Sequence, residues 1–294
     1  MTRRRPRLAV TVGDPRGIGP ELVQRLLADD AITDACDLLV VGPRGTEVDV
    51  HEAVGSWRPG ESVAHAGRLA GDAVIRAVEL AQAGAVRGIV TAPLDKHALL
   101  LGGHEAPGHT ELLADLTGRQ TAMMLAAGPL RVVLATTHIP LRDVPGALTA
   151  ERLAQAVTLT REGLRHWFGI AEPRIALCAL NPHAGDGGRF GTEDDTLLAP
   201  VARATGASGP FPADTVFVRA RRGEFDAVIA PYHDVGMTAI KVASFGEGVN
   251  VTLGLPFPRT SPDHGTALDI AGRGIADPSS MRAATLLCAR FAAH

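Results

Sequence analysis

The sequence predicts an α/β protein with a mainly parallel sheet. Strand-like apolar runs alternate with helix-like segments along the chain, which is the pattern of βαβ units. The length of 294 residues exceeds what one core usually holds, so one large domain or two medium domains are expected. Hydrophobic residues make up 46% and charged residues 21%, the composition of an ordinary globular protein.

The first half of the chain opens with a strand, a glycine-containing turn and a helix. Residues 8–12 are apolar and partly β-branched, and Pro20 stands in the first turn of the helix that follows, where proline is favoured. Further strands are expected at 38–41 and 88–91, and further helices at 71–82 and 109–116. The polar stretch 48–67 contains Gly and Pro, which favours a surface excursion.

The second half contains three apolar runs that each end in a histidine. These runs, 132–138, 175–183 and 228–233, are typical of buried strands in a parallel sheet. Thr149 is expected to cap a long amphipathic helix that reaches about residue 168, and Ser279 to cap the last helix. Each histidine then follows the C-terminal end of a strand, the edge where open α/β sheets bind ligands.

His138, His183 and His233 therefore form a candidate metal site. Three imidazoles leave a position open for substrate and favour zinc or another late divalent ion, with magnesium, cobalt or manganese as alternatives. One histidine after a strand is more often an ordinary loop residue, but three at equivalent positions favour ligation. Acidic neighbours such as Asp234 could orient an imidazole or act as a base.

Two expected helix starts are candidates for binding anions. Gly13, Gly17 and Gly19 permit a tight turn into a helix N-terminus, although the third glycine of the dinucleotide-binding fingerprint is missing. A turn without a ligand is the alternative. His109 and Thr110 open another helix and suit a carboxylate or phosphate, the alternative being a capping threonine beside a surface histidine.

Lys241, Asn250 and Arg259 follow the third histidine at spacings of nine residues. Asn250 stands among β-branched residues, so an inward-facing amide would need a partner. Two cations and an amide near a metal suit an acidic, hydroxylated substrate, and scattered surface charge is the alternative reading.

The composition argues against several other classes. The net charge of −3 and 4% aromatic residues do not favour a nucleic-acid partner, and no apolar stretch approaches the roughly 20 residues of a membrane span. Cys36, Cys178 and Cys288 are odd in number and lie among apolar residues. They are expected to be reduced core cysteines of a cytoplasmic protein.

The chain resembles the 4-hydroxythreonine-4-phosphate dehydrogenase family of vitamin B6 synthesis. The matching segments cover nearly the whole chain in the family's order: 13–21, 108–111, 135–143, 180–188, 209–215, 231–234 and 248–267. The resemblance implies two α/β/α domains with a central cleft, as in the isocitrate and isopropylmalate dehydrogenases. The expected domains are 1–108 with about 265–294 on the cofactor side, and 109–264 for metal binding and dimerisation.

The resemblance also implies roles for particular residues. In the family pattern the metal ligands fall on His138, His183 and His233. Substrate contacts fall on a further set: His109, Thr110, Lys241, Asn250 and Arg259. Gly13, Gly17 and Gly19 are the candidates for contact with NAD or NADP. A homodimer with a shared active site is expected, in which the partner subunit supplies one histidine.

The activity implied is metal-dependent, NAD(P)-linked oxidation of a 3-hydroxy acid followed by decarboxylation. Asp234, Asp214 or a water held by a lysine would take the hydroxyl proton, and Lys241 would supply a proton or hold the carbonyl oxygen. The expected substrate is 4-hydroxythreonine 4-phosphate. Alternatives are 4-phospho-erythronate, 4-phospho-threonate and the cis-dihydrodiol dicarboxylate of terephthalate breakdown.

Two departures from the family pattern concern the choice of substrate. Val235 stands where the family usually has Gln, and Ala92 stands where it more often has Gly. Two functions of other classes are also compatible with a paired α/β architecture. One is a metal- or phosphate-binding protein without catalysis, and the other is a phosphotransacetylase-like acyltransferase, which would not need three histidines at strand ends.

Overall fold

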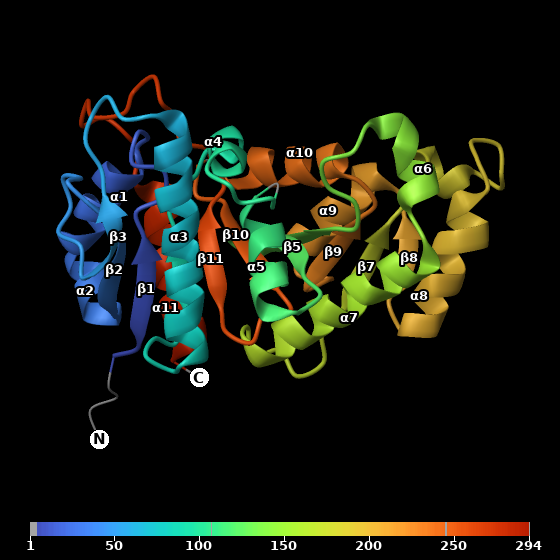
Figure 1. Ribbon diagram of the computed structural model, residues 1–294. Coiled ribbons are helices and arrows are strands. Elements are labelled where there is room, and N and C mark those ends of the chain that lie inside the picture. The colour runs from blue at the N-terminus through green and yellow to red at the C-terminus, as the bar shows by residue number, and fades with distance from the viewer. Residues whose placement is uncertain (1–4, 107, 245, 294) are drawn as a thin grey trace. The chain divides into compact units, whose positions relative to one another are not determined.

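The computed structural model describes residues 5–106, 108–244 and 246–293. The chain divides into two compact units. Unit 1 is Met1–Thr121 with Val249–His294, and unit 2 is Ala122–Gly248. Each unit is an α/β assembly in which helices pack against a sheet (Figure 1).

The sheet of unit 1 has the strand order β3-β2-β1-β4-β11-β10. The strands are β1 (Arg7–Thr11), β2 (Asp37–Arg44), β3 (Glu52–Ser56), β4 (Ile89–Thr91), β10 (Val249–Leu253) and β11 (Arg259–Pro262). Neighbouring strands are parallel except β10 and β11, which run antiparallel. This antiparallel pair is possible because only a short connection joins β10 to β11.

Long helices cover this sheet. The helices of unit 1 are α1 (Gly19–Leu27), α2 (Asp30–Ala35), α3 (Val63–Gln82), α4 (Lys96–Leu101), α5 (His109–Thr117) and α11 (Ser279–Ala292). Helix α3 packs on β1 and β2 with α4 and α5 beside it, while α11 packs on β10 and β11 (Figure 1). Val74, Ile89 and Leu113 lie in the core between the sheet and the α3 side.

The sheet of unit 2 has the strand order β5-β6-β9-β7-β8. The strands are β5 (Ala122–Ala127), β6 (Leu130–Leu134), β7 (Ile175–Cys178), β8 (Ser208–Phe211) and β9 (Ala227–Ala230). β5 and β6 form an antiparallel hairpin, and the remaining neighbours are parallel. The three strands that precede the candidate histidines, β6, β9 and β7, are therefore adjacent and point the same way.

The helices of unit 2 are α6 (Val144–Ala147), α7 (Ala150–His166), α8 (Ala199–Thr205), α9 (Ala213–Arg221) and α10 (His233–Ser244). Short 3₁₀ segments at Leu141–Asp143 and Pro182–Gly185 and a π-helical turn at Asp194–Leu198 complete the unit. Helix α7 packs on the strands from one side, and α9 and α10 pack from the other (Figure 1). Val132, Val228 and Ile240 belong to the core under α9 and α10.

The α/β class and the three strands that precede the candidate histidines are confirmed, and each sheet is mainly parallel with one antiparallel pair. The division into units differs from the expected one at 108/109 and 264/265. Helix α5 packs against α3, and β11 pairs with β4, so His109, Thr110, Asn250 and Arg259 belong to unit 1.

The stretch 48–67 is more ordered than expected. It contains β3 and the buried Trp57, and Ser62 caps the start of α3 by accepting a hydrogen bond from the His65 amide. The predicted helix begins only at residue 71 because glycines lower helix propensity over 67–71. Gly67 is needed there, since a Cβ would lie 1.7 Å from the Ala98 carbonyl oxygen of α4.

Two helix caps can be compared with the prediction. Thr149 caps α7 as expected, accepting from the Arg152 amide. Ser279 is instead the first residue of α11, and the Asp277 carboxylate accepts hydrogen bonds from both its amide and its hydroxyl.

The three cysteines are buried free thiols, as expected for core residues. Burial raises the pKa of Cys288 to about 12, which keeps this thiol protonated at neutral pH. Within the described ranges, none of the helices is both long enough and apolar enough to cross a bilayer.

Candidate functional site

The histidines of unit 2 follow adjacent parallel strands, as predicted. His138 comes after β6, His183 after β7, and His233 opens α10 directly after β9. The exposed ring of His138 and the half-buried ring of His233 lie together, with ring centroids 5.4 Å apart. Two imidazoles that bind one zinc ion at about 2.0–2.1 Å have centroids on the order of 5 Å apart, so this pair fits a shared ion.

Asp234 holds the ring of His233 in a defined orientation. Its Oδ1 lies 2.7 Å from Nδ1 of His233, which leaves Nε2 as the ring nitrogen available to a ligand. A carboxylate on the second ring nitrogen is the usual arrangement for a metal-binding histidine. The geometry therefore favours an orienting role for Asp234 beside the catalytic role that the sequence suggests.

His183 lies on an irregular loop. It has a φ of 54°, in the left-handed region that a non-glycine residue seldom adopts, and its ring neighbours Phe190 at 6.4 Å. The loop is anchored by the fully buried Asp194, whose carboxylate accepts from the amides of Leu180 and Asn181 and from the Asn181 side chain. Sequence inspection does not single out Asp194, because its partners become neighbours only through the loop.

Among the described residues no three His, Cys, Asp or Glu side chains gather closely enough to hold a metal ion. Within one chain the structure thus brings together His138 and His233 but not His183. Lys241 lies on α10 eight residues after His233, about 12 Å further along the helix axis, so it is not brought to the histidine pair either.

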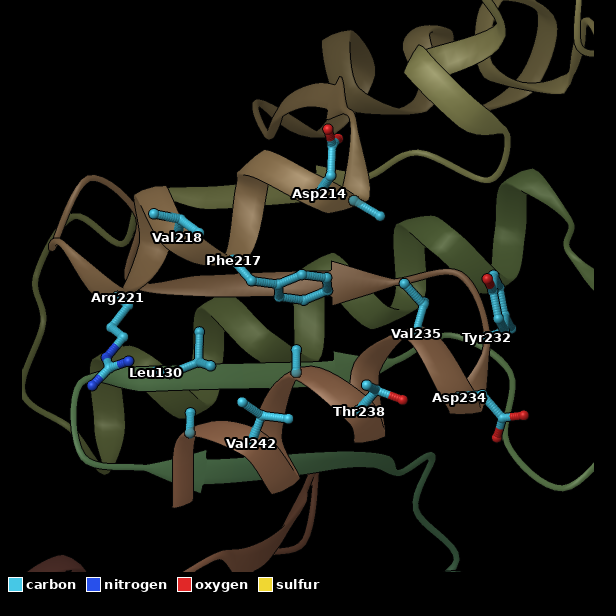
Figure 2. Close-up of a pocket in the computed structure, with 13 residues that line it drawn as sticks. Leu130, Asp214, Phe217, Val218, Arg221, Tyr232, Asp234, Val235, Thr238 and Val242 are labelled. Atoms are coloured by element: carbon cyan, nitrogen blue, oxygen red, sulfur yellow. The ribbon is translucent and has the colours of Figure 1, made fainter. Parts of the chain in front are cut away.

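Asp214 and Asp234 both line a cavity of about 590 Å³ between α9 and α10 (Figure 2). Both residues are exposed, and their carboxylates point away from each other on either side of the Phe217 ring (Figure 2). Val235 lies on the apolar side of this cavity and packs on the core, so the valine extends a hydrophobic wall. The structure does not bring these two carboxylates together.

Arg259 of unit 1 is buried, with 1% of its surface exposed. Its Nη1 donates to the Thr252 hydroxyl at 2.9 Å and its Nη2 to the Thr91 hydroxyl, while Nε has no hydrogen-bond partner among the described residues. Burial lowers the pKa of Arg259 to about 9, with Glu111 acting in the opposite direction, so the guanidinium stays charged at neutral pH. No described carboxylate forms an ion pair with it.

The start of α5 belongs to the same cluster. His109 and Thr110 lie in its first turn, where backbone amides point outward and favour an anion. Burial lowers the pKa of His109 well below 6.5, and the positive charges of Arg259 and Lys96 lower it further. Lys96, near the start of α4, is therefore close enough to add its positive charge to this region.

Several buried polar atoms in this cluster have no hydrogen-bond partner among the described residues: Nε2 of His109, Oδ1 of Asn250, Nε of Arg259 and the hydroxyl of Thr11. Buried polar groups are nearly always paired, so such a group of unpaired atoms requires an explanation. A ligand with both acceptor and donor atoms would satisfy them. We call these residues, with Lys96, Thr91 and Thr252, the Arg259 cluster.

The lowered pKa of His109 predicts how stability changes with pH. Because the unfolded chain binds a proton near pH 6.5 and folded His109 does not, the free energy of unfolding is expected to fall as the pH drops below 6.5. The slope for one proton is about 1.4 kcal/mol per pH unit. His109→Gln should remove this contribution, measured by urea unfolding at a series of pH values. His166→Gln, on an exposed position of α7, controls for the loss of a histidine, and equal slopes for wild type and His109→Gln would refute the prediction.

The glycines predicted to contact the cofactor pack mainly against backbone atoms of the same unit. Gly13 has a φ of 74°, and a Cβ on it would lie 2.3 Å from the Pro93 carbonyl oxygen. A Cβ on Gly19 would lie 2.1 Å from the Val12 carbonyl oxygen. Gly17 lines a cavity, and close backbone packing accounts for the other two.

This cavity lies in unit 1 beyond the ends of β1 and β2 and has a volume of about 390 Å³. Its charged side chains include Arg16, Glu21 and Glu47. Arg16 pairs with the buried Asp14 at 2.6 Å, and Glu21 accepts from the Ala276 amide at 2.9 Å. Glu47 is exposed and has no hydrogen bond or ion pair with another described side chain, so its carboxylate is available to a ligand.

Comparisons with known proteins agree with one another. The model of the family described as pyridoxal phosphate biosynthetic protein PdxA matches residues 22–288. The chain is 45% identical over 312 residues to the 4-hydroxythreonine-4-phosphate dehydrogenase of Beijerinckia indica, covering 94% of this chain and 92% of the relative. It is 43% identical over 334 residues to a protein of Bradyrhizobium diazoefficiens provisionally named D-threonate 4-phosphate dehydrogenase, covering 97% and 96%.

A solved structure extends this likeness to three dimensions. The crystal structure of 4-hydroxythreonine-4-phosphate dehydrogenase from Klebsiella pneumoniae matches with a TM-score of 0.88 and 40% identity, over 100% of both chains. The family model covers most of the chain, and the relatives match nearly their full length. The chain therefore belongs to the family of the pyridoxal phosphate biosynthetic protein PdxA.

Proposed function

We propose that this protein is a metal-dependent, NAD-linked dehydrogenase of a phosphorylated 3-hydroxy acid, with 4-hydroxythreonine 4-phosphate as its substrate. The observation that carries the proposal is the Arg259 cluster, a buried and uncompensated cation beside a helix N-terminus. Such a cluster suits a phosphate or carboxylate. The names of the relatives supply the substrate and the reaction.

In this proposal Arg259, His109 and Thr110 bind the acidic end of the substrate, and Asn250 binds a hydroxyl or amino group. A bound dinucleotide would accept a hydride from the hydroxyl carbon, and the hydroxyl proton would pass to a base. The resulting 3-keto acid then loses carbon dioxide, and the carbon that carried the carboxylate takes up a proton from Lys241 or water. Oxidation and reduction balance, because the dinucleotide gains the two electrons that the alcohol loses.

The metal is the second part of the proposal. His138 and His233 fit a shared ion, and Asp234 orients one of them, which supports zinc before magnesium, cobalt or manganese. A bound divalent ion would supply the positive charge that lowers the pKa of the substrate hydroxyl. Because His183 is not part of this pair, we propose that it completes the site of the partner subunit in a homodimer.

The proton acceptor is proposed to be Asp214 or water rather than Asp234 alone. Asp234 is engaged with His233, whereas the exposed Asp214 has its carboxylate at the rim of the cavity (Figure 2). The protein is also proposed to act in the cytoplasm, where its free thiols remain reduced.

D-threonate 4-phosphate is a second candidate substrate, which the Bradyrhizobium relative favours. It shares the phosphate and the 3-hydroxy acid but has a hydroxyl in place of the amino group. Asn250 accommodates either group, since an amide both donates and accepts hydrogen bonds. 4-Phospho-erythronate and the terephthalate-derived dihydrodiol remain as further alternatives.

A substrate screen tests the proposed function directly. Purified protein loaded with zinc or magnesium is expected to reduce NAD with 4-hydroxythreonine 4-phosphate or D-threonate 4-phosphate, and to release carbon dioxide in equal amount. The dihydrodiol dicarboxylate serves as the substrate without phosphate. Binding of coenzyme A with no reduction of NAD would favour an acyltransferase instead, and bound metal without turnover of any of these substrates would favour a binding protein.

Glu47 is expected to favour NAD over NADP if the 390 Å³ cavity of unit 1 holds the adenosine ribose. A free carboxylate accepts hydrogen bonds from ribose hydroxyls and repels a 2′-phosphate. Glu47→Gln should raise the NADP-to-NAD ratio of kcat/KM by about tenfold. Glu172→Gln, an exposed position in unit 2, is the control, and an unchanged ratio in Glu47→Gln would remove this cavity from the proposal.

A further inference from the structure

Arg259 lies on the middle strand of three, and its neighbours on both sides contribute a threonine. β11 lies between β4 and β10, and the guanidinium donates to Thr91 on β4 and to Thr252 on β10. These strands pair in a register that places Arg259 beside Ile89, two residues before Thr91. The three side chains therefore lie on one face of the sheet, because alternate strand residues share a face.

The two acceptors are neutral, which is unusual for a buried arginine. Buried charges are normally paired with opposite charges, and a carboxylate at either position would neutralise the guanidinium. Hydroxyl groups instead fix the direction of its N–H groups without cancelling the charge. Glu111 affects Arg259 electrostatically but forms no ion pair with it, and burial lowers the pKa of the guanidinium.

The polar groups around Arg259 add positive charge or unpaired hydrogen-bonding atoms rather than a negative charge that would neutralise the guanidinium. Within the part of the chain that the structure describes, neither Nε of Arg259 nor the buried Nε2 of His109 has a hydrogen-bond partner. Lys96 is near enough to lower the pKa of His109 together with Arg259, so the local charge is positive. Thr11 lies on β1 opposite Thr91 of β4, and its buried hydroxyl has no hydrogen-bond partner among the described residues.

We propose that Thr91 and Thr252 are positioning residues that hold the Arg259 guanidinium while leaving its charge uncompensated, which makes the site selective for a doubly charged phosphate over a carboxylate. This inference rests on the proposed function only in the kinetic tests, because these use the proposed phosphorylated substrate. A dianion gains more than a monoanion from an unneutralised cation at short range, and it can accept hydrogen bonds from several donors at once.

The test replaces each threonine by valine, which keeps the shape and removes the hydroxyl. Thr91→Val and Thr252→Val are each expected to raise KM for the phosphorylated substrate about tenfold with little change in kcat, as for the loss of one hydrogen bond to a charged group. Thr260→Val is the matched control. This buried threonine is on the same strand as Arg259, but its hydroxyl donates to Ala284 of α11.

A pH profile separates positioning from a structural effect. Binding requires the charged guanidinium, so 1/KM should fall as the pH rises through about 9, the pKa of Arg259. Loss of a hydroxyl that accepts from the charged form should move this decline about one pH unit lower. Thr91→Ser, which keeps the hydroxyl, should restore both KM and the profile, and should do so even if Thr91→Val folds poorly.

Binding of inorganic phosphate, measured by calorimetry without a dinucleotide, does not depend on turnover. If the wild type binds phosphate more tightly than acetate, and the valine variants lose this preference while Thr260→Val keeps it, the inference holds even when no substrate is oxidised. If the substrate is oxidised but both valine variants behave like Thr260→Val in KM, pH profile and phosphate binding, the inference is refuted and the proposed function stands.

Discussion

Arg259→Met is expected to reduce kcat/KM for a phosphorylated substrate by at least about thirtyfold while leaving the free protein as stable as the wild type or more stable. Removing one partner of a desolvated charge pair between protein and ligand costs about 2–5 kcal/mol of binding. In the free protein the loss of the guanidinium should not lower stability, because this group is buried with two neutral acceptors and no carboxylate partner among the described residues. Replacing such a charge by a hydrophobic side chain is often neutral or stabilising.

Steady-state kinetics and thermal unfolding of the free enzyme measure the two effects. Arg282→Met is the matched control, since Arg282 donates from Nε to the Asp29 carboxylate at 2.6 Å in the same unit. This control should lose some stability and keep KM. A large loss of stability in Arg259→Met, with KM unchanged, would make Arg259 a structural residue and remove the observation that carries the proposed function.

Sequence alone could identify Arg259 as a candidate ligand contact, but it could not establish the role of this residue. A cation within a strand suggests either a ligand contact or surface charge, and the burial that decides between them depends on packing across the sheet. Thr91 and Arg259 are 168 residues apart, and only the pairing of β11 with β4 makes them neighbours. Strand alternation would place Thr252 and Arg259 on one face only after their register is known.

The strand ends of unit 2 show the same limit. Continuous apolar runs predict β6, β7 and β9, since parallel strands are buried on both faces. The runs do not contain the strand order β6-β9-β7, which makes His138 and His233 neighbours. Nor do they predict the left-handed backbone at His183, which the buried carboxylate of Asp194 helps to hold through the amides of Leu180 and Asn181.

His233→Ala is expected to abolish tight metal binding and to lower kcat about a thousandfold, and His138→Ala should do the same. Each substitution removes half of the histidine pair, and loss of a ligand usually leaves too few donors for a stable site. Metal content after dialysis and NAD reduction measure the two effects. His166→Ala, at an exposed position on α7, should retain both.

Mixing of variants tests where the third ligand comes from. If His183 completes the partner's site, chains with His183→Ala refolded with chains carrying His233→Ala should recover about a quarter of the wild-type activity. Half of randomly paired dimers are mixed, and each of these contains one site with all three histidines. Mixtures of His138→Ala with His233→Ala should stay inactive, because these two histidines lie side by side in one chain. Recovery in neither mixture would assign His183 to the same chain as the pair and overturn the shared site.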